Sequence, residues 1–184
     1  GGNCTFTVAF SPTTTGAKTA TFTVTDDNNA AAGATQIVTV TGNGQTAPTA
    51  NLSAPSLTFN TQRVGTNSTA QTVTITNNGQ ATLAIASIAL TGTDLSQYSI
   101  LGSGATPCNL AGGNVLGSAS CSFTVTFSPT STGAKSASVT ITDNANSTGT
   151  PGTTQTVTLS GTGIQASVAL APPLTFPGQK VGTT

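Results

Sequence analysis

The side chains that could do chemistry in this sequence are few. It contains three cysteines, four aspartates, three lysines and one arginine, and it has no histidine, glutamate, methionine or tryptophan. A nucleophilic Ser, Thr or Cys needs a neighbouring base, and no histidine is present to act as one. Paired carboxylates for glycoside chemistry must face one cleft. The only adjacent acids are Asp26 and Asp27, and the aligned positions later in the chain are Asp143-Asn144. We therefore expect no catalytic residues, no enzyme activity and no cofactor.

Aspartates offer one metal-binding hypothesis. Asp26 and Asp27 are followed by two asparagines, and Asp143 begins a related run. Carboxylate and amide oxygens in a loop are ligands for Ca²⁺, but calcium takes six or more oxygens and each run offers few. Asp and Asn also hydrogen-bond their own backbone in tight turns. We favour turns, keep calcium as the weaker alternative, and predict no metal site.

Four asparagines begin N-x-S/T sequons and are candidates for glycosylation: Asn3, Asn51, Asn67 and Asn146. Ser and Thr are so abundant that about this many sequons arise by chance, and O-glycosylation of Thr is equally plausible.

The composition excludes several classes of partner. Charged residues make up 4% of the chain and the formal net charge is zero, against about 25% charged residues in typical soluble domains. Nucleic-acid binding needs clustered Lys or Arg, and here the positive charges are far apart. No apolar run is long enough to span a membrane. A surface of uncharged Thr, Ser and Asn lacks the repulsion that keeps proteins apart, so we expect self-association.

The chain repeats itself. Residues 4–18 read CTFTVAFSPTTTGAK and residues 121–135 read CSFTVTFSPTSTGAK, 117 positions later. The motif LTF at 57–59 returns at 174–176 with the same offset, and QIVTVTGNG at 36–44 returns as QTVTLSGTG at 155–163. These matches predict the C-terminal part of one repeat at 1–44, a complete repeat at 45–163 and the N-terminal part of the next at 164–184. We expect a longer parent protein.

The cysteine positions fit this organisation. Cys108 and Cys121 are 13 positions apart within the complete repeat, and Cys4 is the counterpart of Cys121. The partner of Cys4 is expected upstream of residue 1. A disulfide closing such a loop contributes roughly 3 kcal/mol in the chain-entropy model. The alternative, a zinc site, lacks four ligands, so we predict one disulfide per repeat and an oxidising compartment.

Short alternating segments predict the elements that hold these residues. Apolar residues recur at every second position between Gly, Pro and Asn turns, which is typical of strands with one buried face. In 121–127 the inward set is Cys121, Phe123, Val125 and Phe127. The parity of the inward residues changes near Ala86-Ser87, which predicts a bulge. About seven such strands indicate a two-sheet, immunoglobulin-like sandwich.

The motif set resembles a known family, the bacterial ASPM/SPD-2/Hydin-like (choice-of-anchor D) repeat. The residues that carry the resemblance are Cys108, the run 121–135, Val139–Asp143, Thr158–Gly163, Leu57–Phe59 and Val64–Thr66. The resemblance implies an immunoglobulin-like fold in long secreted or surface-anchored bacterial proteins, and it implies no shared active site.

These observations predict a structural protein. We expect an extracellular or cell-surface fibre, built from repeats that join end to end or complete one another by strand addition. The partner is then another copy or a neighbouring repeat. Two alternatives stay open: an adhesive or glycan-binding stalk, although aromatic residues are only 4% of the chain, and an accessory region of a larger secreted enzyme.

Overall fold

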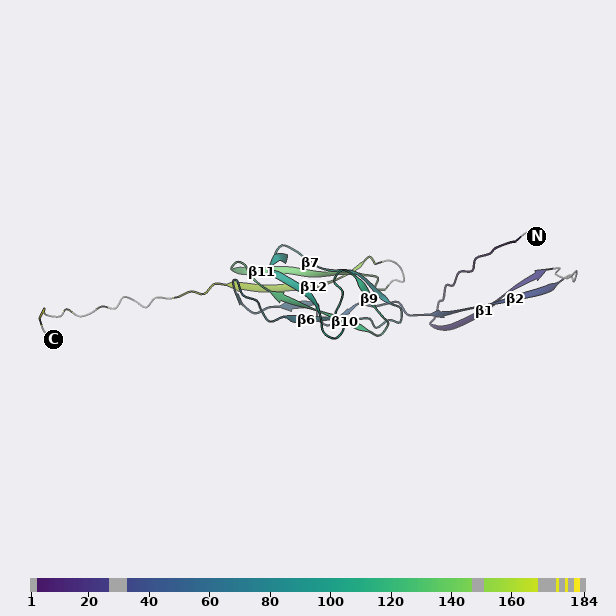
Figure 1. The fold of residues 1–184 in the computed structure, drawn as a ribbon, viewed down its shortest axis with the longest axis horizontal. Coiled ribbons are helices and arrows are strands. Elements are labelled where there is room, and N and C mark those ends of the chain that lie inside the picture. Colours follow the sequence, from purple (N-terminus) through teal and green to yellow (C-terminus); the bar gives the residue numbers. More distant parts are fainter. Residues whose placement is uncertain are drawn as a thin grey trace.

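A computed structural model describes residues 3–26, 33–146 and 151–168, together with residues 175, 178, 181 and 182. These residues form a two-sheet β-sandwich and, before it in the chain, a separate two-stranded hairpin (Figure 1). Within the described residues, no helix is both long enough and apolar enough to cross a bilayer.

The first sheet of the sandwich has four strands in the order β3-β6-β10-β8. Its central strand β10 pairs antiparallel with both β6 and β8. The bounds are β3 Asn51–Leu52, β6 Gln71–Thr76, β8 Tyr98–Ser103 and β10 Ser120–Phe127. A 3-10 turn, η2 Leu95–Gln97, precedes β8.

The second sheet has the order β4-β12-β11-β7-β9, with β5 also pairing with β12. Its bounds are β4 Ser56–Thr58, β5 Gln62–Arg63, β7 Leu83–Thr91, β9 Gly113–Val115, β11 Gly133–Asp143 and β12 Thr153–Ile164. Strands β4 and β5 run parallel to β12, whereas the other pairs are antiparallel.

The alternation read from the sequence is confirmed in the core. Every second residue of β10 is buried, and Val139, Ile141, Val157 and Leu159 cover it from the opposite sheet. Burial of these apolar faces supplies the main favourable term in folding. The predicted bulge is also confirmed, because the register of β7 against β11 skips Ala86.

An aromatic cluster closes one end of the core. The ring centroids of Phe59, Tyr98 and Phe127 lie 5.0–5.9 Å apart. These are typical spacings for tilted aromatic pairs, which add about 0.5–1.5 kcal/mol each beyond their buried area. The three rings come from β8, β10 and the residue after β4, so they tie the start of the repeat to its centre.

The turn after β6 was predicted correctly, but the role given to its glycine was wrong. The sequence Asn77-Asn78-Gly79-Gln80 is typical of a turn whose glycine adopts a positive φ, but Gly79 is not among the glycines that do. A Cβ at Gly79 would instead collide with the backbone carbonyl oxygen of Ala47. The turn also carries the chain from one sheet to the other, since β6 and β7 belong to different sheets.

Candidate interaction surface

The hairpin outside the sandwich consists of β1 Gly16–Asp26 and β2 Ala34–Gly44. Its register, from Gly16 opposite Gly44 to Asp26 opposite Ala34, is that of β11 and β12, where Gly133 lies opposite Gly163 and Asp143 opposite Thr153. The sequence repeat and the strand pairing therefore coincide residue by residue.

The side-chain packing also recurs. A Cβ built on Gly161 would lie 2.7 Å from the ring of Phe127, and one built on Gly42 would lie 2.7 Å from the ring of Phe10. Both glycines leave room for a phenylalanine ring to rest on the sheet. Phe10 and Phe127 thus occupy matching places, one on the hairpin and one in the sandwich.

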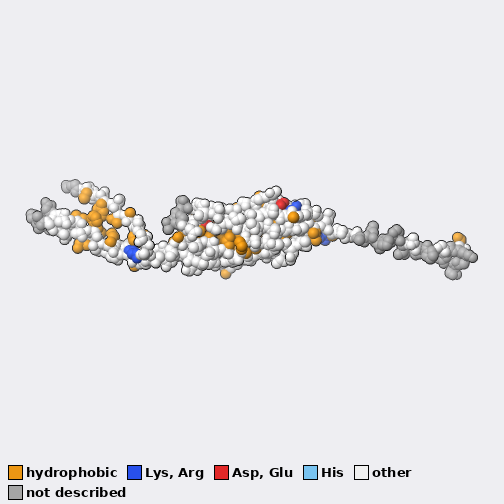
Figure 2. Space-filling model, turned by 180° about the vertical axis from the view of Figure 1, so that it is seen from behind, with side chains coloured by type: hydrophobic (Ala, Val, Ile, Leu, Met, Phe, Trp, Pro, Cys, Tyr) orange, Lys and Arg blue, Asp and Glu red, His pale blue; other side chains and the backbone are white. Residues whose placement is uncertain are grey.

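The two copies differ in what covers them. Phe6, Val8 and Phe10 are 55%, 57% and 52% exposed, whereas their counterparts Phe123, Val125 and Phe127 are fully buried. Phe22, Val24 and Val38 of the hairpin are also exposed, although each matches a buried core residue. We call this set the open face, defined by Phe6, Val8, Phe10, Phe22, Val24, Val38 and Val40. Figure 2 shows hydrophobic side chains gathered over this end of the molecule.

Residues 3–10 form no strand, although their sequence matches β10. In the sandwich β10 hydrogen-bonds to β6 on one side and β8 on the other. Nothing in the described residues supplies those two neighbours to residues 3–10. A strand is stabilised by pairs with its neighbours, and residues 3–10 lack those pairs among the described residues. The segment contacts the hairpin through side chains instead, as in the stacked rings of Phe6 and Phe22, whose centroids lie 4.3 Å apart.

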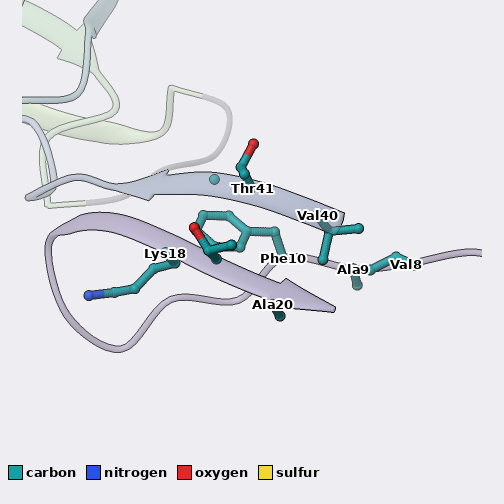
Figure 3. A pocket seen from close by; sticks show the side chains of 9 residues that line it. Val8, Ala9, Phe10, Lys18, Ala20, Val40 and Thr41 are labelled. Atoms are coloured by element: carbon teal, nitrogen blue, oxygen red, sulfur yellow. The ribbon is translucent and has the colours of Figure 1, made fainter. Parts of the chain in front are cut away.

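A groove of about 370 Å³ lies on this face, lined by Val8, Phe10, Ala20, Val40 and Gly42 among others. Figure 3 shows the Phe10 ring between the two strands, with Val40 directed to its side of β2 and Thr41 pointing away. Large exposed apolar areas are typical of surfaces that pack against further polypeptide.

The segment between hairpin and sandwich is held to the sandwich. Thr46 exchanges hydrogen bonds with Gln80 and Ala81. Thr49 donates its N–H to Asn77 Oδ1 at 3.1 Å, and the carbonyl of Pro48 accepts from the N–H of Asn146 at 2.8 Å. The junction between hairpin and sandwich is thus fixed to the sandwich over residues 46–49.

Asn77 organises this junction, although the residues around it, Asn77-Asn78-Gly79, indicate only a turn. Its side chain is fully buried. Oδ1 accepts from the N–H groups of Thr49 and Gly79, and Nδ2 donates to the carbonyls of Ala81, Val115 and Leu116. A buried amide with all its groups paired fixes one arrangement of the chain around it.

The predicted disulfide is present in the sandwich. Cys108 and Cys121 form a disulfide, with their Cα atoms 4.9 Å apart. Cys4, the counterpart of Cys121, is an exposed free thiol.

A comparison with protein families matches residues 48–164 to the model described as Cep192 domain 4. The chain belongs to the Cep192 domain 4 family. The match begins at the junction and ends with β12, so it covers the sandwich and excludes the hairpin.

Solved structures are similar at low identity. The PapD-like domain 7 of human CEP192 is 17% identical, with 66% of this chain and 89% of that chain covered and a TM-score of 0.46. WR4, an MSP family member from C. elegans, is 16% identical, with 61% and 96% covered and a TM-score of 0.42. A protein of unknown function from Porphyromonas gingivalis is 12% identical, with 82% and 67% covered and a TM-score of 0.47. No curated protein matches the chain at a significant level.

The aspartates of this family member are not brought together. Asp143 is fully buried, and its Oδ1 accepts from the N–H of Ala145 at 2.7 Å and the hydroxyl of Thr153 at 2.8 Å, while Oδ2 has no partner among the described residues. Asp26 ends β1 at the corresponding position, and Asp27 lies outside the described residues. The described part of the chain holds no group of three or more Cys or Asp side chains able to share a metal ion. Asp143 thus hydrogen-bonds its own backbone in a turn, as its Asp-Asn sequence predicts.

The four sequon asparagines, Asn3, Asn51, Asn67 and Asn146, are all exposed. Glycosylation of these residues stays a prediction.

Among the residues that the structure describes, Tyr98 is the titratable group whose pKa is clearly shifted. Burial, and then the negative charge of Asp94, raise the pKa of Tyr98 to about 12. Its hydroxyl donates to the carbonyl of Lys135 at 3.0 Å. The residue is neutral at ordinary pH and serves as a core aromatic with a satisfied polar end.

Proposed function

We propose that this chain is a non-catalytic, structural segment of a secreted or cell-surface protein in which immunoglobulin-like repeats join into a fibre. The observation that carries the proposal is the open face. It has the sequence, the strand register and the glycine–phenylalanine packing of the sandwich's own C-terminal third, but its core is uncovered. A face of this kind belongs to a second sandwich of about 117 residues that other strands complete.

The junction supports a stiff fibre. Successive repeats in a flexible array are separated by solvated, Gly- or Ser-rich linkers. Here residues 46–49 are bonded to the turn 77–81 and to Asn146 of the following sandwich. A segment held to the following sandwich leaves little free linker between one repeat and the next, which limits bending of the array.

The chemistry of the surface supports an extracellular setting. The disulfide between Cys108 and Cys121 requires oxidising conditions to persist. On the face of the sandwich drawn in Figure 2, few side chains are charged and few are hydrophobic. The motifs that resemble bacterial choice-of-anchor D repeats also support an extracellular setting.

Electron microscopy of material isolated from its native source tests the proposal. β12 has 12 residues, so one sandwich is about 40 Å long at roughly 3.3 Å per residue. We expect unbranched filaments with a bead spacing close to that length. Short isolated rods would indicate a monomeric stalk instead of a fibre. Single compact particles without linear order would contradict the proposal.

A further inference from the structure

The two sheets of the sandwich end on strands that differ in how well their outer edges are protected. The four-stranded sheet ends on β3 and β8, and the other sheet ends on β9 and on β4 with β5. Strands β3 and β5 have two residues each, and β4 and β9 have three. Pro55 precedes β4, and Arg63 lies on β5. Short strands, prolines and charges are the usual means of keeping a sheet edge from pairing with another chain.

Strand β8 lacks these protections. It has six residues, YSILGS, with no charge and no proline. Leu101 is 69% exposed on the outer face of the sheet, opposite Thr124 of β10. The strand lies well inside the sandwich that the family match covers. A long, uncharged edge strand with an exposed apolar side chain is a site where another strand can add.

The hydrogen-bond ladder shows which backbone groups of β8 point outward. The N–H of Ser128 donates to the carbonyl of Gln97 at 2.8 Å, so Gln97 faces β10. Backbone groups of successive residues alternate between the two edges of a strand, and Leu101 therefore also faces β10. The N–H and C=O groups of Ile100 and Gly102 point to the outer edge, where no strand among the described residues pairs with them.

We propose that β8 of one copy pairs antiparallel with β8 of a second copy, with Leu101 opposite Leu101. The pairing joins the two four-stranded sheets into one continuous sheet. In this register Ile100 of each copy lies opposite Gly102 of the other, and each such pair exchanges both of its outward hydrogen bonds. The Leu101 pair is a non-hydrogen-bonded pair, in which side chains on one face come closest.

The partner is a second copy because β8 is complementary to itself. Two antiparallel copies of one strand are related by a two-fold axis, as an isologous interface requires. No like charges meet across that axis, since neither β8 nor its neighbour β10 carries a charge. Registers two residues away place Leu101 opposite Ser99 or Ser103, so they give up the contact between two apolar side chains.

The inference goes beyond the proposed function, because this contact joins sandwiches side by side. The long strands of the sandwich run along its long axis (Figure 1), so an edge strand faces sideways. An edge of six residues is smaller than a stable protein interface, and we expect one such contact to be weak. Repeats aligned along two fibres would add many of these contacts, and their combined strength exceeds that of each one.

Cysteine trapping in the chain of residues 1–184 tests the register. In the proposed pair Ser99 lies opposite Ser103 of the other copy, with about 4.5 Å between their Cα atoms, which is within disulfide reach. Two variants both carry Cys4→Ser to remove the free thiol. One also carries Ser99→Cys and the other Ser103→Cys, and they are mixed in a glutathione redox buffer.

We expect the disulfide-linked heterodimer to form at least about tenfold faster than either homodimer, because two cysteines at the same position lie about 13 Å apart along the strands. Adding Leu101→Lys to both variants removes the apolar contact and places like charges opposite each other. We expect this change to slow trapping at least about tenfold.

The matched control is Leu116→Lys, at a leucine that follows β9 and is 65% exposed. It should leave the trapping rate within about twofold, and neither lysine should shift the urea unfolding midpoint, because both side chains are exposed.

Three results would overturn the inference: homodimers that form as fast as the heterodimer, equal slowing by Leu101→Lys and Leu116→Lys, and no slowing by Leu101→Lys. The first is expected if copies associate through the open face. Any of these results beside native beaded filaments would remove the side-by-side contact and leave the proposed function in place. Register-specific trapping without filaments would support the contact and count against the fibre.

Discussion

Phe10 and Phe127 form a matched pair that separates a complete core from an incomplete one. Both follow an alternating segment, precede Ser-Pro and rest on a glycine of the neighbouring strand. Phe127 is fully buried, with its ring 5.0 Å from that of Tyr98, whereas Phe10 is 52% exposed. The same substitution to alanine therefore removes very different numbers of contacts.

We expect Phe127→Ala to destabilise the sandwich by about 3–5 kcal/mol, because the lost ring leaves a cavity in a packed core. With a urea dependence of about 2 kcal/mol/M, a loss of 4 kcal/mol lowers the unfolding midpoint by about 2 M. Phe10→Ala should shift the same midpoint by less than about 0.5 M, because substitutions outside a packed core usually stay within about 0.5 kcal/mol.

Fluorescence of Tyr98, the single tyrosine in a chain without tryptophan, reports unfolding of the sandwich alone. Urea titrations of the three proteins at one concentration give the midpoints. Equal shifts for the two variants would refute the view that the open face is an uncovered core. A loss below about 1 kcal/mol for Phe127→Ala would show that the aromatic cluster contributes little.

Three further predictions concern the junction, the thiols and the tyrosine. Asn77→Ala should lower the free energy of unfolding, measured with urea, by about 2–4 kcal/mol, because it leaves buried backbone groups without hydrogen-bond partners. The control Asn78→Ala, at the exposed neighbouring residue, should lower it by less than about 0.5 kcal/mol. Similar losses for both variants would contradict the role of Asn77 at the junction. In the chain of residues 1–184 a thiol reagent should count one reactive thiol, at Cys4, and a count of three would contradict the disulfide between Cys108 and Cys121. Tyr98 should ionise with a midpoint near 12 in the folded chain, against about 10 when unfolded. Because the pKa of Tyr98 is higher in the folded chain, the contribution of the neutral hydroxyl to folding stability is complete below pH 10 and is lost as the pH rises towards 12. An absorbance midpoint near 10 in the folded chain would be inconsistent with a buried hydroxyl.

The sequence was sufficient to predict the sandwich because alternation encodes burial directly. Phe123 and Val125 repeat at the period of a strand, and they are buried where that period places them. The change of parity near Ala86 likewise predicted a bulge that the register confirms. Both features depend on local order along one strand.

Features that depend on distant partners could not be predicted. Residues 4–10 alternate as β10 does, yet they form no strand, because their hydrogen-bonding neighbours are contributed by other segments. Asn77 was assigned only to a turn, although its amide joins three separate segments. The conformation of Gly79 was predicted wrongly because its true constraint is the approach of Ala47, about 30 positions away.

A high-resolution structure of the assembled native material tests the central claim most directly. In the assembly we predict that residues 3–10 form a strand paired on both sides and that the Phe10 ring is buried under an aromatic side chain, as Phe127 lies under Phe59 in the sandwich. If Phe10 stays exposed and residues 3–10 stay unpaired in the assembled state, the hairpin is not part of a second sandwich.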